Sequence, residues 1–240
     1  MADAIFDDPR LAAVYDPLDP DRSDLGVYLG LAVGFGARAV LDIGCGTGTF
    51  ACMLAAQGID VTGLDPAGAS LDVAQGKPEA KDIRWVHGDV KALPPLQVDL
   101  VTMTANVAQV FLTDEEWLAV LKAAREALRP GGHLVFETRD PAREAWRGWT
   151  RERSYRRVDI EGIGAVESWR ELENVDGDLV TFRSLTVFES DGKEVPSRST
   201  LRFRGRDEIA AQLRETGFMV EHVLDAPDRP GLEWVFVSRL

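Results

Sequence analysis

The chain has 240 residues, of which 45% are hydrophobic and 28% are charged. This composition predicts one compact domain with an elaboration and a sizeable core. The net charge of −13 argues against a nucleic-acid partner, because binding to nucleic acid depends on Lys and Arg that neutralise phosphates. No stretch approaches the roughly 20 apolar residues of a membrane helix, and the acidic N-terminus lacks a signal peptide's apolar run. We therefore expect a soluble cytoplasmic protein with no membrane or nucleic-acid partner.

The first 37 residues are predicted to be helical in two pieces. The pieces lie around Pro9–Tyr15 and Ser23–Val33, and a linker rich in Asp and Pro separates them at residues 16–21. Ser23 is a plausible N-cap for the second piece.

From residue 39, short apolar strands alternate with helices. Near-continuous apolar strands in such an alternation predict a parallel, doubly wound sheet with helices on both faces. The predicted strands are 39–43, 59–64, 83–87, 98–104 and 132–138, and the predicted helices are 48–57, 67–75 and 114–128.

After residue 138 the pattern changes. Residues 139–157 are rich in Arg and Trp and show mixed order. Three segments with period-two character then predict an antiparallel meander inserted into the parallel fold; they are 163–173, 178–189 and 196–204. The tail predicts a return to the main domain through a helix at 207–216 and strands at 218–224 and 234–238.

A glycine-rich turn, Asp42-x-Gly44-x-Gly46-x-Gly48, joins the first of these strands to its helix. Such a turn presents backbone N–H groups and a positive helix end to a ligand. A phosphate-binding P-loop would need a Lys-Ser/Thr pair after the glycines, and none is present. A dinucleotide fingerprint would need a third glycine where Thr49 stands. A nucleoside ligand without a pyrophosphate is therefore favoured.

This turn resembles motif I of the class I S-adenosylmethionine-dependent methyltransferases. The resemblance covers most of residues 38–138 and resumes at Leu213–Phe218. It implies an α/β fold: a Rossmann-like, doubly wound, seven-stranded sheet, mostly parallel with an antiparallel last strand, and an inserted antiparallel β meander. It also implies S-adenosylmethionine as cofactor, S-adenosylhomocysteine as product, and in-line methyl transfer to a nitrogen or oxygen atom of a small molecule. The turn residues expected at the cofactor are Asp42, Gly44, Cys45, Gly46 and Gly48.

Two acidic residues follow the next two strands. Asp65 comes 21 residues after Gly44, where a carboxylate can accept both hydroxyls of a ribose, and Pro66 opens the next helix. An N-cap role for Asp65 is the alternative. By the resemblance, Asp89 accepts from the adenine amino group and the N–H of Val90 meets a ring nitrogen. Ordinary turn chemistry is the alternative for Asp89.

Three residues are candidates for the methyl-transfer site. By the resemblance, the backbone near Thr104 meets the amino-acid part of the cofactor, while Asn106 and Gln109 face the reacting atoms. The alternatives are a turn role for Asn106 and a solvent-facing Gln109. Val14-Tyr15-Asp16 resembles a segment that closes over the cofactor, so Tyr15 is a candidate lid residue, with surface packing as its alternative. No convincing general base stands out.

These expectations divide the chain into three parts. Residues 1–37 form an N-terminal helical lid, 38–138 with 206–240 a Rossmann-like cofactor-binding domain, and 139–205 an insertion that shapes the substrate pocket. The histidines lack metal-ligand spacing, so no metal is expected. Arginines in 139–157 either steer an anionic substrate or pair with nearby acids. The chain is expected to be a monomer or homodimer. An NAD(P)-dependent oxidoreductase and a non-catalytic nucleoside-binding module remain alternatives.

Overall fold

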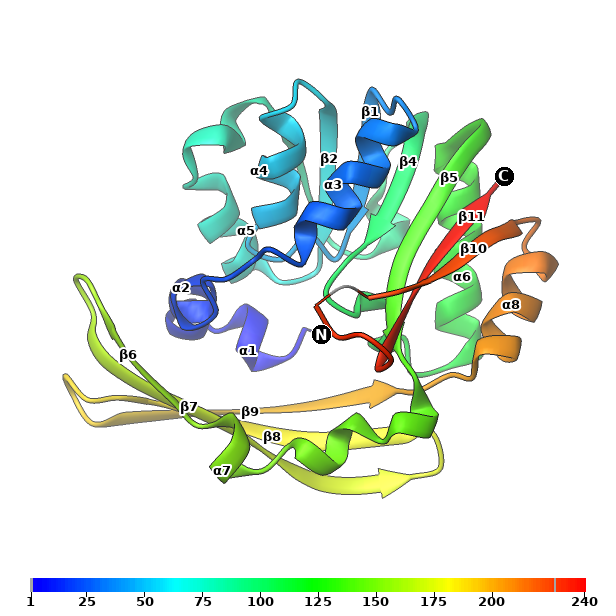
Figure 1. Cartoon of the computed structure of the whole chain (residues 1–240). Helices are drawn as coiled ribbons and strands as arrows, with labels where there is room; N and C mark the ends of the chain where they lie inside the picture. Colours follow the sequence, from blue (N-terminus) through cyan, green and yellow to red (C-terminus); the bar gives the residue numbers. More distant parts are fainter. Residues whose placement is uncertain (1, 227) are drawn as a thin grey trace.

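The computed structural model describes residues 2–226 and 228–240, which form two separate sheets (Figure 1). The larger sheet has seven strands in the order β10-β11-β5-β4-β1-β2-β3. Neighbours from β5 to β3 are parallel, whereas β11 is antiparallel to both β5 and β10. The predicted fold class is confirmed. The strands are β1 (Ala39–Ile43), β2 (Asp60–Asp65), β3 (Arg84–His87), β4 (Val98–Met103), β5 (Leu128–Arg139), β10 (Met219–Asp225) and β11 (Glu233–Arg239).

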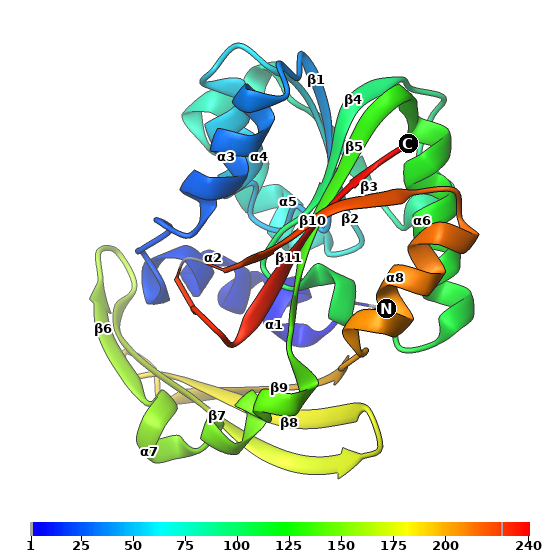
Figure 2. The ribbon, with the colours of Figure 1, turned by 45° about the vertical axis from the view of Figure 1, so that its right-hand side comes forward.

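Helices cover both faces of this sheet, and each face has its own apolar core (Figures 1 and 2). Phe50 and Tyr28 belong to the core under α3 and α4, and Trp117 and Phe236 to the core under α6 and α8. The helices are α3 (Leu25–Gly34), α4 (Thr49–Ala55), α5 (Gly68–Gln75), α6 (Asp114–Ala127) and α8 (Arg206–Glu215). Short 3-10 turns are η1 (Pro78–Asp82), η2 (Val90–Ala92), η3 (Val107–Gln109), η4 (Pro141–Arg143) and η5 (Ala145–Gly148). No helix within the described ranges is both long and apolar enough to cross a membrane.

The second sheet is the insertion, and it has four strands rather than the three predicted. They pair in sequence order: β6 (Arg156–Ile160), β7 (Gly164–Asp176), β8 (Leu179–Phe188) and β9 (Lys193–Arg202), preceded by α7 (Arg151–Ser154). The interpretation of residues 139–157 as chain of mixed order did not predict β6, which begins at Arg156. This strand lies at a sheet edge with most of its side chains exposed, so it lacks the alternation that marks a half-buried strand.

Two N-terminal helices lie between the sheets, as Figures 1 and 2 show. They are α1 (Ala4–Asp7) and α2 (Pro9–Leu18). Leu11 and Val14 of α2 join Val166 and Phe188 of the insertion in one buried cluster. The first three residues of the predicted linker are helical, and Pro17 lies in the last turn of α2. A proline there removes one backbone donor near the point where the helix ends anyway.

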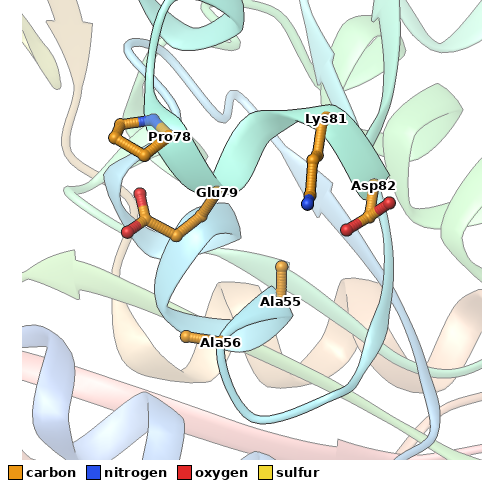
Figure 3. Close-up of a pocket in the computed structure, with 6 residues that line it drawn as sticks. All are labelled: Ala55, Ala56, Pro78, Glu79, Lys81 and Asp82. Carbon is orange, nitrogen blue, oxygen red and sulfur yellow. The ribbon is translucent and has the colours of Figure 1, made fainter.

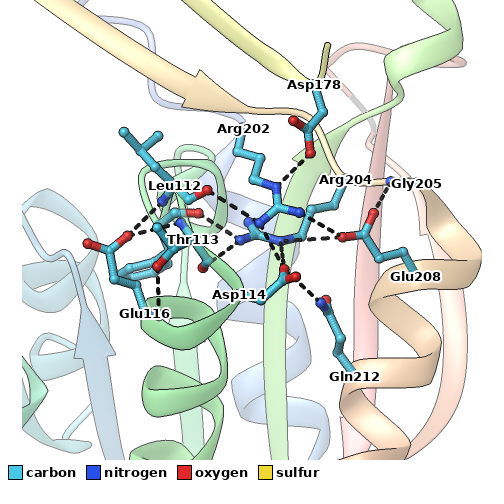
Figure 4. A network of polar contacts seen from close by, with 11 residues as sticks. Leu112, Thr113, Asp114, Glu116, Asp178, Arg202, Arg204, Gly205, Glu208 and Gln212 are labelled. Atoms are coloured by element: carbon cyan, nitrogen blue, oxygen red, sulfur yellow. Dashed lines mark hydrogen bonds and ion pairs between the residues drawn. The ribbon is translucent and has the colours of Figure 1, made fainter. Parts of the chain in front are cut away.

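A polar cluster fastens the return of the insertion to the larger sheet's layer (Figure 4). Arg202, at the end of β9, forms ion pairs with Asp114 at 2.8 Å and Asp178 at 2.6 Å. Arg204 is 3% exposed and donates to the carbonyls of Phe111 at 2.8 Å and Thr113 at 3.0 Å. Burial, together with the charge of Arg202, lowers the pKa of Arg204 to about 10. The exit of the insertion is thereby fixed against the start of α6.

Candidate active site

The glycine turn is held against the neighbouring strand by its own backbone. The N–H groups of Gly44 and Cys45 both donate to the carbonyl of Leu64, at 2.8 and 3.1 Å. Gly44, Gly46 and Gly48 all adopt positive φ, with values of 71°, 54° and 77°. Glycine is the residue that reaches this region without strain, so the turn geometry explains the glycines in part.

The surroundings of the three glycines distinguish their roles. A Cβ at Gly44 would lie 2.5 Å from a methyl carbon of Val107, and one at Gly48 would lie 2.6 Å from Cη2 of Trp85. A Cβ at Gly46 would meet no described heavy atom within 4 Å. Packing therefore excludes larger residues at the outer two positions, whereas Gly46 borders open space where a ligand can lie against the main chain.

Asp65 links the turn to the helix that follows β2. One carboxylate oxygen accepts from the N–H of Gly46 and the other from the N–H of Ala67, both at 2.8 Å. Asp65 is 7% exposed, and burial raises its pKa despite these two bonds. The N-cap of α5 is Ala67 and it has no side-chain cap bond, so the N-cap alternative for Asp65 is wrong: its bond to Ala67 closes a turn ahead of the helix. The bond to Gly46 places the carboxylate beside the glycine turn. The predicted ribose contact stays a prediction. Pro66 follows in the chain, and its carbonyl lies 3.1 Å from Nε2 of His87.

Asp42 lies on β1 and is 1% exposed. Its Oδ1 accepts from the hydroxyl of Thr102 at 2.8 Å, while Oδ2 is buried without a hydrogen-bond partner among the described residues. Burial raises the pKa of this carboxyl to about 7, and the charge of Asp65 adds to the effect. Asp42 is therefore a buried acid poised between its two protonation states near neutral pH.

Asp89 follows β3 and is exposed. Its carboxylate accepts from the N–H of Lys91 at 2.8 Å and caps the short turn that Val90 begins. This is the turn chemistry raised as an alternative. Because β3 is parallel to β2, Asp89 and Asp65 both follow the carboxyl ends of neighbouring strands. The predicted adenine contacts of Asp89 and Val90 stay predictions.

The segment after β4 has a strained backbone, and two of its first three side chains are buried. Thr104 is 6% exposed, and both Ala105 and Asn106 adopt left-handed φ values, 54° and 62°. Such residues cost of order 1–3 kcal/mol each and cluster at functional sites. Asn106 donates from its backbone N–H to Glu137 at 3.2 Å and from Nδ2 to Glu233 at 3.1 Å. Asn106 is therefore more than a simple turn residue.

Gln109 is fully buried, so the alternative of a solvent-facing side chain is wrong. Its Oε1 accepts from Arg139 at 2.9 Å, and its Nε2 donates to the carbonyl of Arg202 at 3.4 Å. The short turn η3 places it between β5 and the end of the insertion. The tertiary fold buries this polar side chain and satisfies it with these two hydrogen bonds.

A buried ionic network behind Asn106 was not predicted. Tyr28 of α3 donates to Glu137 at the end of β5, and Glu233 pairs with Arg139 at 3.2 Å and with Arg229 at 2.7 Å. Burial raises the pKa of Glu137 and of Tyr28, and it lowers that of Arg139 to about 10. The only signal in the sequence was a glutamate within the apolar run of β5.

The N-terminal segment lies directly against the glycine turn. Asp16 of α2 accepts from the hydroxyl of Thr47 and from Nζ of Lys77, both at 2.7 Å. Tyr15 is half-buried beside Phe6, with ring centroids 5.7 Å apart, and burial raises its pKa. Asp16 belongs to the segment Val14-Tyr15-Asp16, in which Tyr15 alone was a predicted site residue. The lid role of this segment stays a prediction.

An open hollow lies away from these residues, at the C-terminal end of α4 and along η1 (Figure 3). Thr49 begins α4 at the glycine turn, so the hollow is at the opposite end of this helix. None of the predicted site residues lines it; the lining residues are Ala55, Ala56, Pro78, Glu79, Lys81 and Asp82.

Neither cysteine forms a disulfide: Cys45 and Cys52 are free and buried, and burial raises the pKa of the Cys45 thiol well above its ordinary value. Across residues 2–226 and 228–240, no group of three His, Cys, Asp or Glu side chains is placed to hold a metal ion.

Comparison with known proteins shows what the part of the chain that carries the glycine turn is similar to. A family model described as a methyltransferase domain matches residues 40–132. The segment that carries the glycine turn therefore resembles a methyltransferase domain. A cypemycin N-terminal methyltransferase of Streptomyces is 37% identical over 106 residues, which are 44% of this chain and 43% of that protein. A ubiquinone biosynthesis O-methyltransferase of Pectobacterium carotovorum is 33% identical over 127 residues, covering 51% and 52%. The chain thus spans about half the length of these relatives.

Solved structures extend the likeness of the methyltransferase domain to the whole fold. DesVI of Streptomyces venezuelae superposes with a TM-score of 0.78 at 22% identity, over 95% of this chain and 97% of that one. A sugar N-methyltransferase of Streptoalloteichus gives 0.75 at 20% identity, over 95% and 91%. Because each superposition covers 95% of this chain, the likeness in fold extends well beyond residues 40–132.

Proposed function

We propose that this protein transfers a methyl group from S-adenosylmethionine to a nitrogen or oxygen atom of a small molecule. The observation that carries the proposal is the open space beside Gly46, which is bordered by Asp65 and lies next to Thr47, the residue bonded to Asp16 of α2. The methyltransferase domain model covers this same turn. The printed names of the relatives include both N- and O-methyltransferases, so the acceptor atom stays open between them.

The residues present fit the cofactor. The turn offers main chain without a side chain at Gly46, and a thioether nucleoside needs no lysine for phosphate. Asp65 retains acceptor capacity for ribose hydroxyls, since each carboxylate oxygen has a second lone pair. Asp89 and Val90 would then meet the adenine, and the backbone near Thr104 the amino-acid part.

When bound, S-adenosylmethionine supplies a methyl group already activated by its sulfonium. The chain's own task is to align the acceptor and exclude water. In this proposal residues 1–37 act as the lid, held to the turn through Asp16, and residues 139–205 form the opposite wall of the substrate pocket. In the same proposal, the strained Ala105–Asn106 backbone forms the bottom of the pocket, between the lid and the insertion. Tyr15, Asn106 and Gln109 stay candidates for contact with the acceptor, with no assigned general base.

Two alternatives meet different objections. The comparisons do not favour an NAD(P)-dependent oxidoreductase, because the relatives and fold neighbours reported above are methyltransferases. A non-catalytic nucleoside-binding module of the same fold would bind the cofactor without transferring its methyl group, so only a turnover assay distinguishes it from an enzyme. The net charge of −13 supports a small-molecule partner over nucleic acid. We also propose a cytoplasmic location.

A pair of glycine variants tests the cofactor site. Gly46 and Gly58 both have positive φ and open space around an added Cβ, so Gly46→Ala and Gly58→Ala carry a similar backbone cost of about 1–2 kcal/mol. Gly58 lies beyond the far end of α4. Calorimetric titration with S-adenosylhomocysteine should show binding by the wild type and Gly58→Ala, and loss of binding by Gly46→Ala.

Titration with NAD should show no binding in any of the three proteins. Equal affinity for S-adenosylhomocysteine in both variants would contradict the placement of the cofactor, and no binding by the wild type would refute the proposed function. A screen of small amines and phenols with radiolabelled methyl donor then decides whether the bound cofactor turns over.

A further inference from the structure

One face of the inserted sheet is turned toward α2. Val166 and Phe188 on this face lie in one buried cluster with Leu11 and Val14 of α2, and Figure 1 shows α2 over the sheet. Side chains alternate along a strand, and the pairing of β7 with β8 is regular from Val166 to Arg170. Arg170 therefore projects from the same face as Val166, which we call the inner face.

Arg170 on the inner face is partly buried and unpaired. Among residues 2–226 and 228–240 its backbone bonds to Ser154, but its guanidinium makes no ion pair or hydrogen bond. Burial and the positive charges of Arg156 and Arg229 lower its pKa. A desolvated guanidinium without a counter-ion is unfavourable in a folded protein unless a ligand supplies one.

Two further donors near Arg170 also lack a described partner. Ser184 lies directly opposite Arg170 in the register of β7 and β8, and its hydroxyl makes no hydrogen bond within the described ranges. The same holds for the hydroxyl of Tyr15 on α2, whose pKa responds to the charge of Arg170. The neighbouring residue Asp16 holds the glycine turn through Thr47. These donors thus lie between the inner face and the helix that contacts the turn.

The arginines of 139–157 behave differently. Each of the following pairs with a described carboxylate within 4.0 Å: Arg139, Arg143, Arg147, Arg156 and Arg157. Their charges are used within the fold, so the pairing interpretation holds for them. Arg151 and Arg153 of the same run make no described ion pair, but both are exposed to solvent. Arg170 differs from them because it is unpaired and partly buried on the inner face, outside the run that the sequence pointed to.

We propose that Arg170, with the hydroxyls of Ser184 and Tyr15, binds an oxyanion carried by the methyl acceptor, either a carboxylate or a phosphate. A planar guanidinium binds both groups through two parallel hydrogen bonds, and the hydroxyls supply further donors. This inference rests on the proposed methyl transfer, and it narrows the substrate to an anionic small molecule. Arg170 then acts in substrate binding and orientation, with no part in the chemical step.

Titration with two simple anions tests this subsite. Inorganic phosphate and benzoate are titrated separately into the protein, with and without S-adenosylhomocysteine, for the wild type, Arg170→Gln and Arg183→Gln. Arg183 is the matched control, because it is exposed on the other face of β8 and makes no described ion pair. We expect one anion to bind the wild type and Arg183→Gln, and Arg170→Gln to weaken it at least about tenfold. The anion that binds tells a phosphate-bearing acceptor from a carboxylate-bearing one.

The proposal is overturned if neither anion binds the wild type, or if Arg170→Gln and Arg183→Gln bind equally. Should Arg170→Gln fail to fold, Arg170→Lys takes its place. Lysine keeps the positive charge but lacks the forked geometry of the guanidinium, so we expect Arg170→Lys to bind the anion more weakly than the wild type does. Unchanged affinity of Arg170→Lys then counts against the forked contact and overturns the proposal in that arm. Failure of S-adenosylhomocysteine to bind refutes the proposed function instead, since the anion titrations are also run without it.

Discussion

The buried carboxyl of Asp42 makes the stability of this protein depend on pH in a defined window. Its pKa is about 7 in the folded chain against an ordinary value of 3.8. Between these values the folded state holds a proton that the unfolded state releases, so stability falls as the pH rises. At about 1.4 kcal/mol per pH unit, this carboxyl alone removes about 4 kcal/mol of stability between pH 4 and pH 7. The figure is an upper limit, because buried sites relax when they ionise.

Asp42→Asn isolates this contribution. The amide matches the protonated acid in shape, can still accept from Thr102, and cannot ionise. Urea unfolding of the wild type and the variant should give similar stabilities near pH 4, and the variant should become the more stable by up to about 4 kcal/mol at pH 7. Other buried acids such as Glu137 titrate in both proteins and cancel in the difference. A difference that stays constant from pH 4 to pH 7 would refute the reasoning.

Three further changes test separate contacts. Asp16→Asn should weaken the contact between α2 and the glycine turn by about 1 kcal/mol. Amide hydrogen exchange should then be faster over residues 9–18 and unchanged in α6; the same exchange rates in variant and wild type over residues 9–18 would sink the idea. Arg204→Met should lower the free energy of unfolding by about 2–4 kcal/mol in urea, because two buried carbonyls lose their donor; a loss below about 1 kcal/mol would show that they find other partners. Gly48→Ala should cost at least about 2 kcal/mol in urea, more than Gly58→Ala, because its Cβ would meet Trp85; equal costs would contradict the packing argument.

The parallel sheet and the glycine turn were predictable because their signals are local. The strand Ala39–Ile43 is apolar at every position except Asp42. Thr113 is the N-cap of α6 and forms a capping box with Glu116, a pattern visible in the sequence. Each such signal lies within one element, so it survives without knowledge of the tertiary fold.

The missed features depend on residues far apart in the chain. Tyr28 meets Glu137 across 109 positions, and Asn106 meets Glu233 across 127. No repeating pattern of side chains along the sequence indicates such pairs. The same reason explains Arg170: whether an arginine has a counter-ion depends on which acids the fold brings to it. The edge strand β6 was missed because its exposed, charged side chains carry no alternating pattern.

The anchoring of the insertion at both ends suggests how this fold can exchange its specificity. Arg139 closes β5 with a pairing to Glu233, and Arg204 fixes the return against the entrance of α6. The inserted sheet is fixed at these two points and also packs against α2, while the glycine turn belongs to the other sheet. A graft of residues 140–201 from a relative of the same architecture, with 202–205 retained, should therefore exchange the acceptor recognised and leave the donor site in place.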